Sequence, residues 1–320
     1  MAISILLIIL GFALLIKGAD FLVDGAANIA KKFHIPEIII GLTIVSIGTS
    51  MPELFVSITS AIDGYADMAI GNVIGSNLCN LLLILGLSAV LQSIVFKRET
   101  RLIEIPMTLA VTVIFFALCN SNQDITRGEG IVLLLLFVAF IFYTIYMGKR
   151  GEAFDKEDTL VEIKTEEAKP ISIWKSVFAI LIGIIGLKIG GDFVVDNAVQ
   201  IAETFHISEK VISLTIIAIG TSLPELVTSV TAAIKGDSDI AIGNILGSNI
   251  FNMLLIIGVS AIITPIQYAV SYNNQILVLI IATILLALFP FIGKKNEMTR
   301  TNGIAYLVIY AIYMVGLFIS

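Results

Sequence analysis

Long apolar stretches alternate with short polar segments along the whole chain. Most stretches are close to the length of about 20 residues that an α-helix needs to cross a bilayer. The composition agrees with this pattern, because 58% of the 320 residues are hydrophobic and only 14% are charged. We therefore expect an all-α membrane protein with ten spans, at 3–30, 38–61, 67–91, 102–119, 129–147, 173–200, 210–234, 239–263, 274–292 and 302–319.

The polar residues inside these spans recur at a constant offset of 172 residues. The segment IGTSMPEL at 47–54 recurs as IGTSLPEL at 219–226. The segment AIGNVIGSNLCN at 69–80 recurs as AIGNILGSNIFN at 241–252. Chance similarity between apolar helices does not keep polar residues in register, so the chain is expected to contain a duplication. The predicted parts are a five-helix repeat at 1–147, a charged loop at 148–172 and a second five-helix repeat at 173–320.

Each repeat has five spans, so the second repeat should enter the membrane from the side opposite to the first. The placement of positive charge supports this inversion, because lysine and arginine gather in the loops that follow the odd-numbered spans. Such loops face the cytoplasm. We therefore expect the plasma (inner) membrane, both termini outside and a cytoplasmic loop at 148–172. The lysines and arginines outside these loops are Lys17, Lys188, Arg127 and Lys210.

Pro52 and Pro224 interrupt the second and seventh spans, and each is followed directly by a glutamate. A proline has no N–H to pair with the carbonyl four residues earlier, so each helix should break there. Backbone left unpaired at membrane depth is tolerated where it lines a cavity, and intramembrane carboxylates mark ion pathways. Glu53 and Glu225 are therefore expected to lie at a cation site.

Hydroxyl and amide side chains share a helix face with each glutamate, because they are three or four residues apart. All of these groups offer oxygen, which suits Na⁺ and Ca²⁺ and argues against zinc or copper. A pliable cage favours Ca²⁺ over Mg²⁺, since Mg²⁺ dehydrates reluctantly. The polar positions are Thr43, Ser46, Ser50 and Ser57, then Thr215, Ala218, Ser222 and Ser229, then Asn72, Ser76 and Asn80, and finally Asn244, Ser248 and Asn252.

Charge suggests a mechanism for such a site. Two ionised glutamates without cations cost at least ~2.5–3.5 kcal/mol per charge inside a membrane. One Ca²⁺ or two Na⁺ neutralise the pair. A carrier built on Glu53 and Glu225 should therefore cross only when it is loaded, as obligatory exchange requires.

The motifs GTSMPE…GNVIGSNLCN and GTSLPE…GNILGSNIFN closely resemble the two alpha repeats of the cation/calcium exchanger superfamily, and within it the prokaryotic sodium/calcium exchangers. The resemblance covers both halves. It implies two inverted five-helix repeats whose second, third, seventh and eighth helices are broken or close-packed around a central cation site. It also implies an electrogenic antiporter that uses the Na⁺ gradient to expel Ca²⁺ by alternating access, as the first and sixth helices slide across the rest.

The resemblance also implies a set of cation ligands. Glu53, Glu225, Thr49 and Thr221 are expected to hold Ca²⁺. Four of the ligands would act at least partly through backbone carbonyls, namely Ser46, Ala218, Thr49 and Thr221. The full implied set is Ser46, Thr49, Ser50, Glu53, Ser76 and Asn80 with Ala218, Thr221, Ser222, Glu225, Ser248 and Asn252.

One position departs from this resemblance. Some prokaryotic relatives and the potassium-dependent branch carry aspartate where this chain has Asn252, which weakens the case for K⁺ co-transport. A Ca²⁺/H⁺ antiporter using the same glutamates remains the alternative, and a cation channel is a further class. A membrane enzyme is disfavoured, since no histidine cluster or Ser/His/Asp arrangement occurs at membrane depth. The expected partners are Na⁺, Ca²⁺ and lipid, without cofactor or nucleic acid, and a monomer suffices.

Several other polar residues have plainer interpretations. Asn77 and Asn249 are expected to pack helices together. Lys17 and Lys188 precede Asp20 and Asp192 by three and four residues, so local ion pairs are plausible there. A role in an entry path is the alternative for the four aspartates of the first and sixth spans, which are Asp20, Asp24, Asp192 and Asp196.

Overall fold

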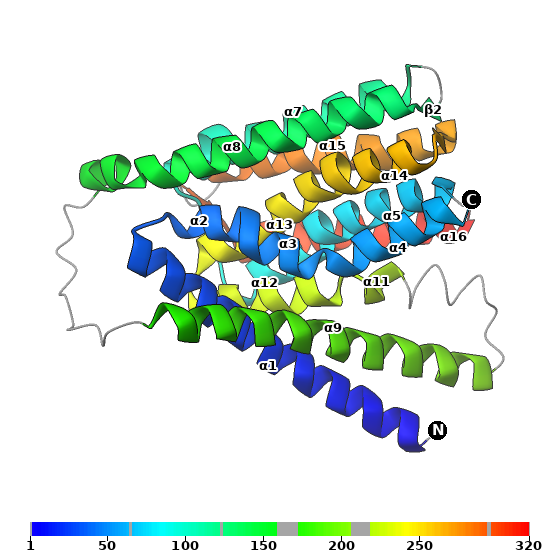
Figure 1. Cartoon of the computed structure of the whole chain (residues 1–320), viewed down its shortest axis with the longest axis horizontal. Coiled ribbons are helices and arrows are strands. Elements are labelled where there is room, and N and C mark those ends of the chain that lie inside the picture. Colours follow the sequence, from blue (N-terminus) through cyan, green and yellow to red (C-terminus); the bar gives the residue numbers. More distant parts are fainter. Residues whose placement is uncertain are drawn as a thin grey trace.

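The computed structural model describes residues 2–63, 66–121, 124–158, 172–205, 218–292 and 296–319. Its helices form one elongated stack, and the two ends of the chain lie at the same end of it (Figure 1). The first half contains α1 (Ala2–Phe33), α2 (Glu37–Ile40), η1 (Gly41–Val45), α3 (Ser46–Thr49), α4 (Met51–Ile62), α5 (Ala66–Leu78), η2 (Cys79–Ile84), α6 (Leu85–Leu91), β1 (Ile94–Val95), η3 (Thr100–Glu104), α7 (Ile105–Cys119), β2 (Asp124–Ile125) and α8 (Arg127–Asp158).

Within its described residues, the second half has a similar order of elements. The expected seventh span, 210–234, lies partly outside the described residues, because the structure describes none between 205 and 218. The elements are α9 (Ile173–Thr204), α11 (Ala218–Gly220), α12 (Leu223–Lys235), α13 (Ser238–Phe251), η5 (Asn252–Ile256), α14 (Ile257–Ile263), β3 (Ile266–Gln267), η6 (Val270–Tyr272), α15 (Asn273–Leu288), η7 (Phe289–Phe291), β4 (Glu297–Met298) and α16 (Arg300–Ile319).

The described helices are those of a multi-pass membrane protein. Eight are long and apolar enough to cross a bilayer, and a ninth span results if the bent pair Glu37–Thr49 and Met51–Ile62 is one span. Their ends lie within a few residues of the expected spans, except for the seventh. Two spans form the centre, because 83% of an 18-residue stretch of Ser238–Ile263 and 78% of one in Met68–Leu91 are buried.

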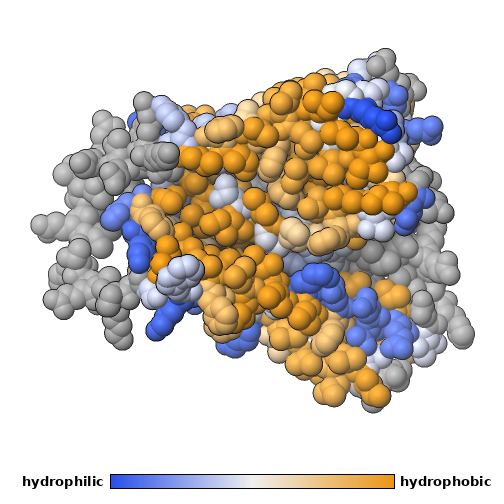
Figure 2. Space-filling view, in the orientation of Figure 1, coloured by the Kyte–Doolittle hydropathy of each residue, from blue (hydrophilic) through white to orange (hydrophobic). Residues whose placement is uncertain are grey.

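The outer helices expose apolar side chains instead. Only 11% of the residues of Arg300–Leu317 are buried, and Phe142 of α8 is 69% exposed. Orange, hydrophobic residues cover most of the face shown in Figure 2. A surface of this kind suits lipid, which takes the place of water around membrane-spanning helices.

Helices α1 and α9 cross along one side of the stack (Figure 1), and they approach each other at glycines. A Cβ on Gly190 would lie 2.7 Å from the carbonyl oxygen of Gly11 and 2.8 Å from the backbone nitrogen of Leu15. A Cβ on Gly18 would lie 2.8 Å from the backbone nitrogen of Leu187. Small residues let helix backbones touch within a membrane, so these glycines permit the crossing.

Two features differ from the sequence-based expectation. The charged loop was expected to begin at 148, but α8 continues to Asp158. Lysine, arginine, glutamate and alanine within 148–158 favour helix, so the helix does not end where its apolar stretch ends. The remainder of the loop, 159–171, lies outside the described residues. The short strands were also not predicted; β1 pairs with β4 and β2 pairs with β3, both antiparallel.

Candidate cation site

Each of the two glutamates begins a half-helix. The second span bends by 50° between α3 and α4, which confirms the predicted break. Ser50 at the bend has φ −85° and ψ 10°, and Ser222 before α12 has φ −87° and ψ 6°. The prolines that follow lie in the first helical turn, where no N–H is needed. Glu53 and Glu225 therefore lie at helix N-termini, whose partial positive charge stabilises a carboxylate.

Two central helices change their pitch beside the glutamates. Helix α5 passes into the π-helical segment η2 at Cys79, and α13 passes into η5 at Asn252. Wider π-helical turns are often found at functional sites, because they alter the direction in which side chains point. Asn80 and Asn252 lie in these segments and are each 1% exposed.

Serines from each half of the chain contact the glutamate of the other half. The hydroxyl of Ser50 donates to Oε1 of Glu225 at 2.7 Å. The hydroxyl of Ser222 donates to Oε1 of Glu53 at 3.4 Å. Ser248 also donates to Oε1 of Glu225, at 3.4 Å. The two carboxyl groups are each 1% exposed, so the site places two acidic side chains in one buried space.

Each carboxylate leaves its second oxygen without a hydrogen-bond partner. Hydroxyl and amide oxygens around them share this property. A buried oxygen without a partner costs about 1–3 kcal/mol, and a cation can supply the missing contact. Ca²⁺ binds about 6–8 oxygens in flexible geometry. The buried oxygens without partners here are Oε2 of Glu53, Oε2 of Glu225, Oγ of Ser76, Oδ1 of Asn80, Oγ1 of Thr221 and Oδ1 of Asn252.

The donor chemistry fits a hard cation. Within the described ranges, no three or more histidine, cysteine, aspartate or glutamate residues gather as they would around a metal ion. The groups that donate to the two carboxylates are hydroxyls, from Ser50, Ser222 and Ser248. Such a set suits Na⁺ and Ca²⁺ better than zinc or copper.

The structure buries most of the expected ligands together. Thr221 is half-buried, while Ala218 begins α11 and its side chain lies outside the described part. Thr215 also lies outside it. The fully buried ones are Ser46, Thr49, Ser50, Glu53, Ser76, Asn80, Ser222, Glu225, Ser248 and Asn252.

Ser46 and Thr49 make hydrogen bonds that the sequence did not indicate. The carbonyl of Ser46 accepts the N–H of Ser50 at 3.0 Å and the hydroxyl of Thr49 at 3.3 Å. Thr49 also contacts Oδ1 of Asn244 at 3.0 Å. A cation bound to the Ser46 carbonyl would replace the contact from Thr49, whose hydroxyl could turn fully to Asn244.

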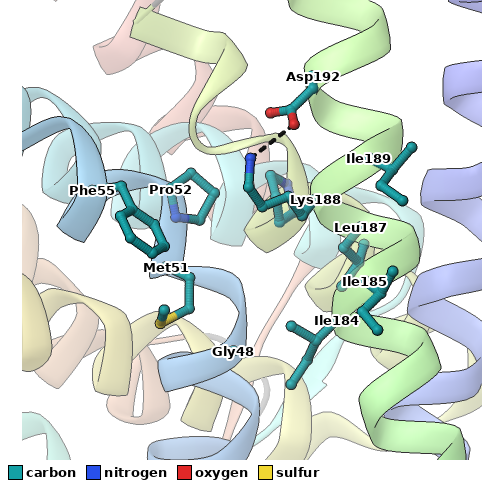
Figure 3. Close-up of a pocket in the computed structure, with 11 residues that line it drawn as sticks. Gly48, Met51, Pro52, Phe55, Ile184, Ile185, Leu187, Lys188, Ile189 and Asp192 are labelled. Carbon is teal, nitrogen blue, oxygen red and sulfur yellow. Dashed lines mark hydrogen bonds and ion pairs between the residues drawn. The ribbon is translucent and has the colours of Figure 1, made fainter.

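A cavity of about 310 Å³ lies beside the break. Figure 3 shows Pro52 and Phe55 of α4 on one side of it and residues of α9 on the other. Pro224 also lines it, so the cavity reaches both prolines that precede the glutamates. Lys188 and Asp192 lie at this cavity and form an ion pair of 2.8 Å, as predicted. Its walls come from distant segments, so the sequence alone did not reveal it.

A second ion-pair cluster ties α1 to α12. Lys17 contacts Asp20 at 3.6 Å, as the sequence predicted. Lys235, in the last turn of α12, contacts Asp20 at 3.1 Å and Asp24 at 2.8 Å. The sequence gave no sign of these two contacts, because Lys235 is more than 200 residues from its partners.

Comparisons with known proteins find relatives over nearly the whole chain. The family model described as "Sodium/calcium exchanger protein" matches residues 3–146 and 175–319. The chain is 39% identical to the putative antiporter CaxA of Alkalimonas amylolytica, over the full length of both. It is 31% identical to the sodium/calcium exchanger MaX1 of Methanosarcina acetivorans, over 99% of each chain. The solved structure of the sodium-calcium exchanger NCX_Mj is similar with a TM-score of 0.84 and 32% identity, over 98% of both chains.

Proposed function

Because the chain belongs to the sodium/calcium exchanger family, we propose that it is a secondary active antiporter that exchanges Na⁺ for Ca²⁺. In this proposal Glu53 and Glu225 are the central cation ligands, and the exchange is electrogenic and independent of K⁺. The ions reach the site alternately from the two sides of the membrane.

The buried oxygens without partners carry this proposal. They come from both halves of the chain and surround two carboxylates at helix N-termini. One Ca²⁺ neutralises the two charges. Hydroxyl and carbonyl oxygens offer further positions for Na⁺, so more than two Na⁺ per Ca²⁺ can bind, which makes the exchange electrogenic. With Asn252 instead of an aspartate, the site has no third carboxylate that K⁺ would have to balance.

The proposed arrangement has two inverted five-helix repeats, 1–147 and 173–320, joined by a cytoplasmic segment at 148–172. The cation site lies where they meet. An even number of spans places both termini on one side of the membrane, and the two chain ends at one end of the stack support this (Figure 1). The excess of lysine and arginine in the opposite loops favours the outside of the plasma membrane for the termini.

The proposal is tested by uptake of radioactive Ca²⁺ into proteoliposomes loaded with Na⁺. An imposed Na⁺ gradient should drive uptake, and a membrane potential should change its rate. Glu53→Gln and Glu225→Gln should each lower uptake by about two orders of magnitude or more. Removing a carboxylate from a buried carboxylate–cation pair leaves the cation without its opposite charge and costs about 3–5 kcal/mol. Near-normal Ca²⁺ uptake by both variants would refute the assigned role of the glutamates.

A Ca²⁺/H⁺ antiporter is the second candidate. In that candidate, Glu53 and Glu225 would bind protons in place of Na⁺. The same vesicles separate the candidates when the Na⁺ gradient is replaced by a pH gradient. We expect the pH gradient alone to drive no Ca²⁺ uptake.

A further inference from the structure

Four asparagines join the two halves of the chain beside the cation site. The amide nitrogen of Asn80 donates to Oδ1 of Asn249 at 3.1 Å, and that of Asn252 donates to Oδ1 of Asn77 at 3.0 Å. The side chains of Asn77 and Asn249 each donate to the backbone carbonyl of the other, at 3.3 and 3.4 Å. All four side chains are at most 1% exposed, so water does not compete for these bonds.

The backbone carbonyls fix the direction of every amide in this group. A backbone carbonyl can only accept, so the amide nitrogen of Asn249 must face the carbonyl of Asn77. Oδ1 of Asn249 is then an acceptor, and it requires the nitrogen of Asn80. The oxygen of Asn80 must therefore point away from Asn249. The equivalent contacts orient Asn252. The amide nitrogen of Asn77 faces the carbonyl of Asn249, so Oδ1 of Asn77 accepts from the nitrogen of Asn252, whose oxygen points away.

We propose that Asn77 and Asn249 are positioning residues that keep the side-chain oxygens of Asn252 and Asn80 turned toward the bound cation. This inference rests on the proposed function and assigns each ligand a partner in the other half. Both oxygens are among the buried ones without a hydrogen-bond partner. Asn77 and Asn249 would not touch the ion themselves.

The orientation matters because an amide has two opposite ends. Its oxygen carries partial negative charge and attracts a cation, whereas its NH₂ group repels one. Without the acceptor on Asn249, the Asn80 amide could rotate and present either end. Groups that orient metal ligands typically change metal affinity about 10–100-fold when they are mutated.

A double-mutant cycle on Ca²⁺ binding tests this. Calorimetry on the purified full-length protein measures the dissociation constant, and the unfolding temperature reports on the fold. Asn249→Leu keeps a similar volume without an acceptor and should weaken Ca²⁺ binding about 10-fold or more. In an Asn80→Ala background, where no amide needs orienting, Asn249→Leu should cause little further loss.

The matched control places Asn249→Leu in an Asn252→Ala background. Asn249 does not orient Asn252, so the roughly 10-fold loss should persist there. The same loss in the Asn80→Ala background would show a merely structural role and overturn the inference. If Asn249→Leu does not yield folded protein, Asn77→Leu with Asn252→Ala gives the equivalent cycle. Wild-type protein that binds no Ca²⁺ would instead contradict the proposed function.

Discussion

The hydroxyl of Ser50 lies 2.7 Å from Oε1 of Glu225 and donates to it. At the equivalent place in the other half, Ser222 lies 3.4 Å from Oε1 of Glu53. Glu225 also has a second hydroxyl contact, from Ser248. The two glutamates are related by the offset of 172 residues, yet one is held by shorter and more numerous bonds than the other.

This asymmetry predicts different effects of two matched substitutions. A hydrogen bond to a charged group contributes about 1.5–3 kcal/mol, and a bond of 2.7 Å is stronger than one of 3.4 Å. Ser50→Ala should therefore weaken Ca²⁺ binding about 10-fold, and Ser222→Ala should weaken it less. Calorimetric titration of both purified variants provides the comparison. Equal losses would mean that the two contacts become equivalent once the ion is bound.

The proline at the break can be tested separately from the glutamate. Pro52→Ala restores an N–H that can pair with the carbonyl of Gly48, so α3 and α4 can join into a straighter helix. Glu53 would then lie within a continuous helix and no longer at a helix N-terminus. We expect Ca²⁺ uptake to fall at least several-fold while the unfolding temperature stays the same or rises. Uptake equal to that of the wild type would show that the bend does not depend on proline.

The crossing of α1 and α9 offers two adjacent glycines with opposite surroundings. A Cβ on Gly190 would lie 2.7 Å from the backbone of α1, whereas a Cβ on Gly191 would have no atom within 4 Å. Gly190→Ala should therefore push the helices apart and cost about 1–3 kcal/mol of stability. Gly191→Ala should be tolerated or slightly stabilising, because alanine favours helix.

Transport and the unfolding temperature should be measured on both glycine variants. If α1 and α9 move during exchange, Gly190→Ala should also slow Ca²⁺ uptake, and Gly191→Ala should not. Similar uptake by the two variants would mean that the close crossing does not matter for transport.

Local signals predicted local structure well. Pro52 sets the helix break through its own missing N–H, and Lys188 finds Asp192 one helical turn away. Contacts between the halves could not be predicted in this way. Lys235 meets Asp20 only because α1 packs on α12. The direction of the Asn80 amide likewise depends on a bond to Asn249, 169 residues later.

Lys235 should stabilise the contact between α1 and α12. It links α12 to α1 through Asp20 and Asp24, whereas the equivalent position in the first half is Asp63, of opposite charge. The cluster is partly exposed, so each pair contributes only about 0.2–1 kcal/mol. Lys235→Gln should speed amide hydrogen exchange in the last turns of α1, by no more than about 5-fold per pair lost.

Lys188→Gln is the control for Lys235→Gln. Its partner Asp192 lies four residues away on the same helix, so the change removes an ion pair without separating two helices. Hydrogen exchange in α1 should be unchanged, and high salt should reduce the difference between the two variants. Faster exchange of α1 in both variants would argue against a specific link between α1 and α12.

The charge of the site should decide whether K⁺ takes part. Asn252→Asp adds a third carboxylate, so one Ca²⁺ no longer neutralises the site, and a monovalent cation must accompany it. The variant should take up Ca²⁺ slowly without K⁺ and faster when K⁺ is added, whereas the wild type should be indifferent to K⁺. Tracer Ca²⁺ uptake with and without K⁺ measures this.

The substitution Asn252→Asp also removes the donor to Oδ1 of Asn77, so Asn77→Leu provides the control. That variant loses the same bond without new charge, and it should weaken Ca²⁺ binding without creating a response to K⁺. A wild-type protein that K⁺ stimulates would contradict the proposal that exchange is independent of K⁺.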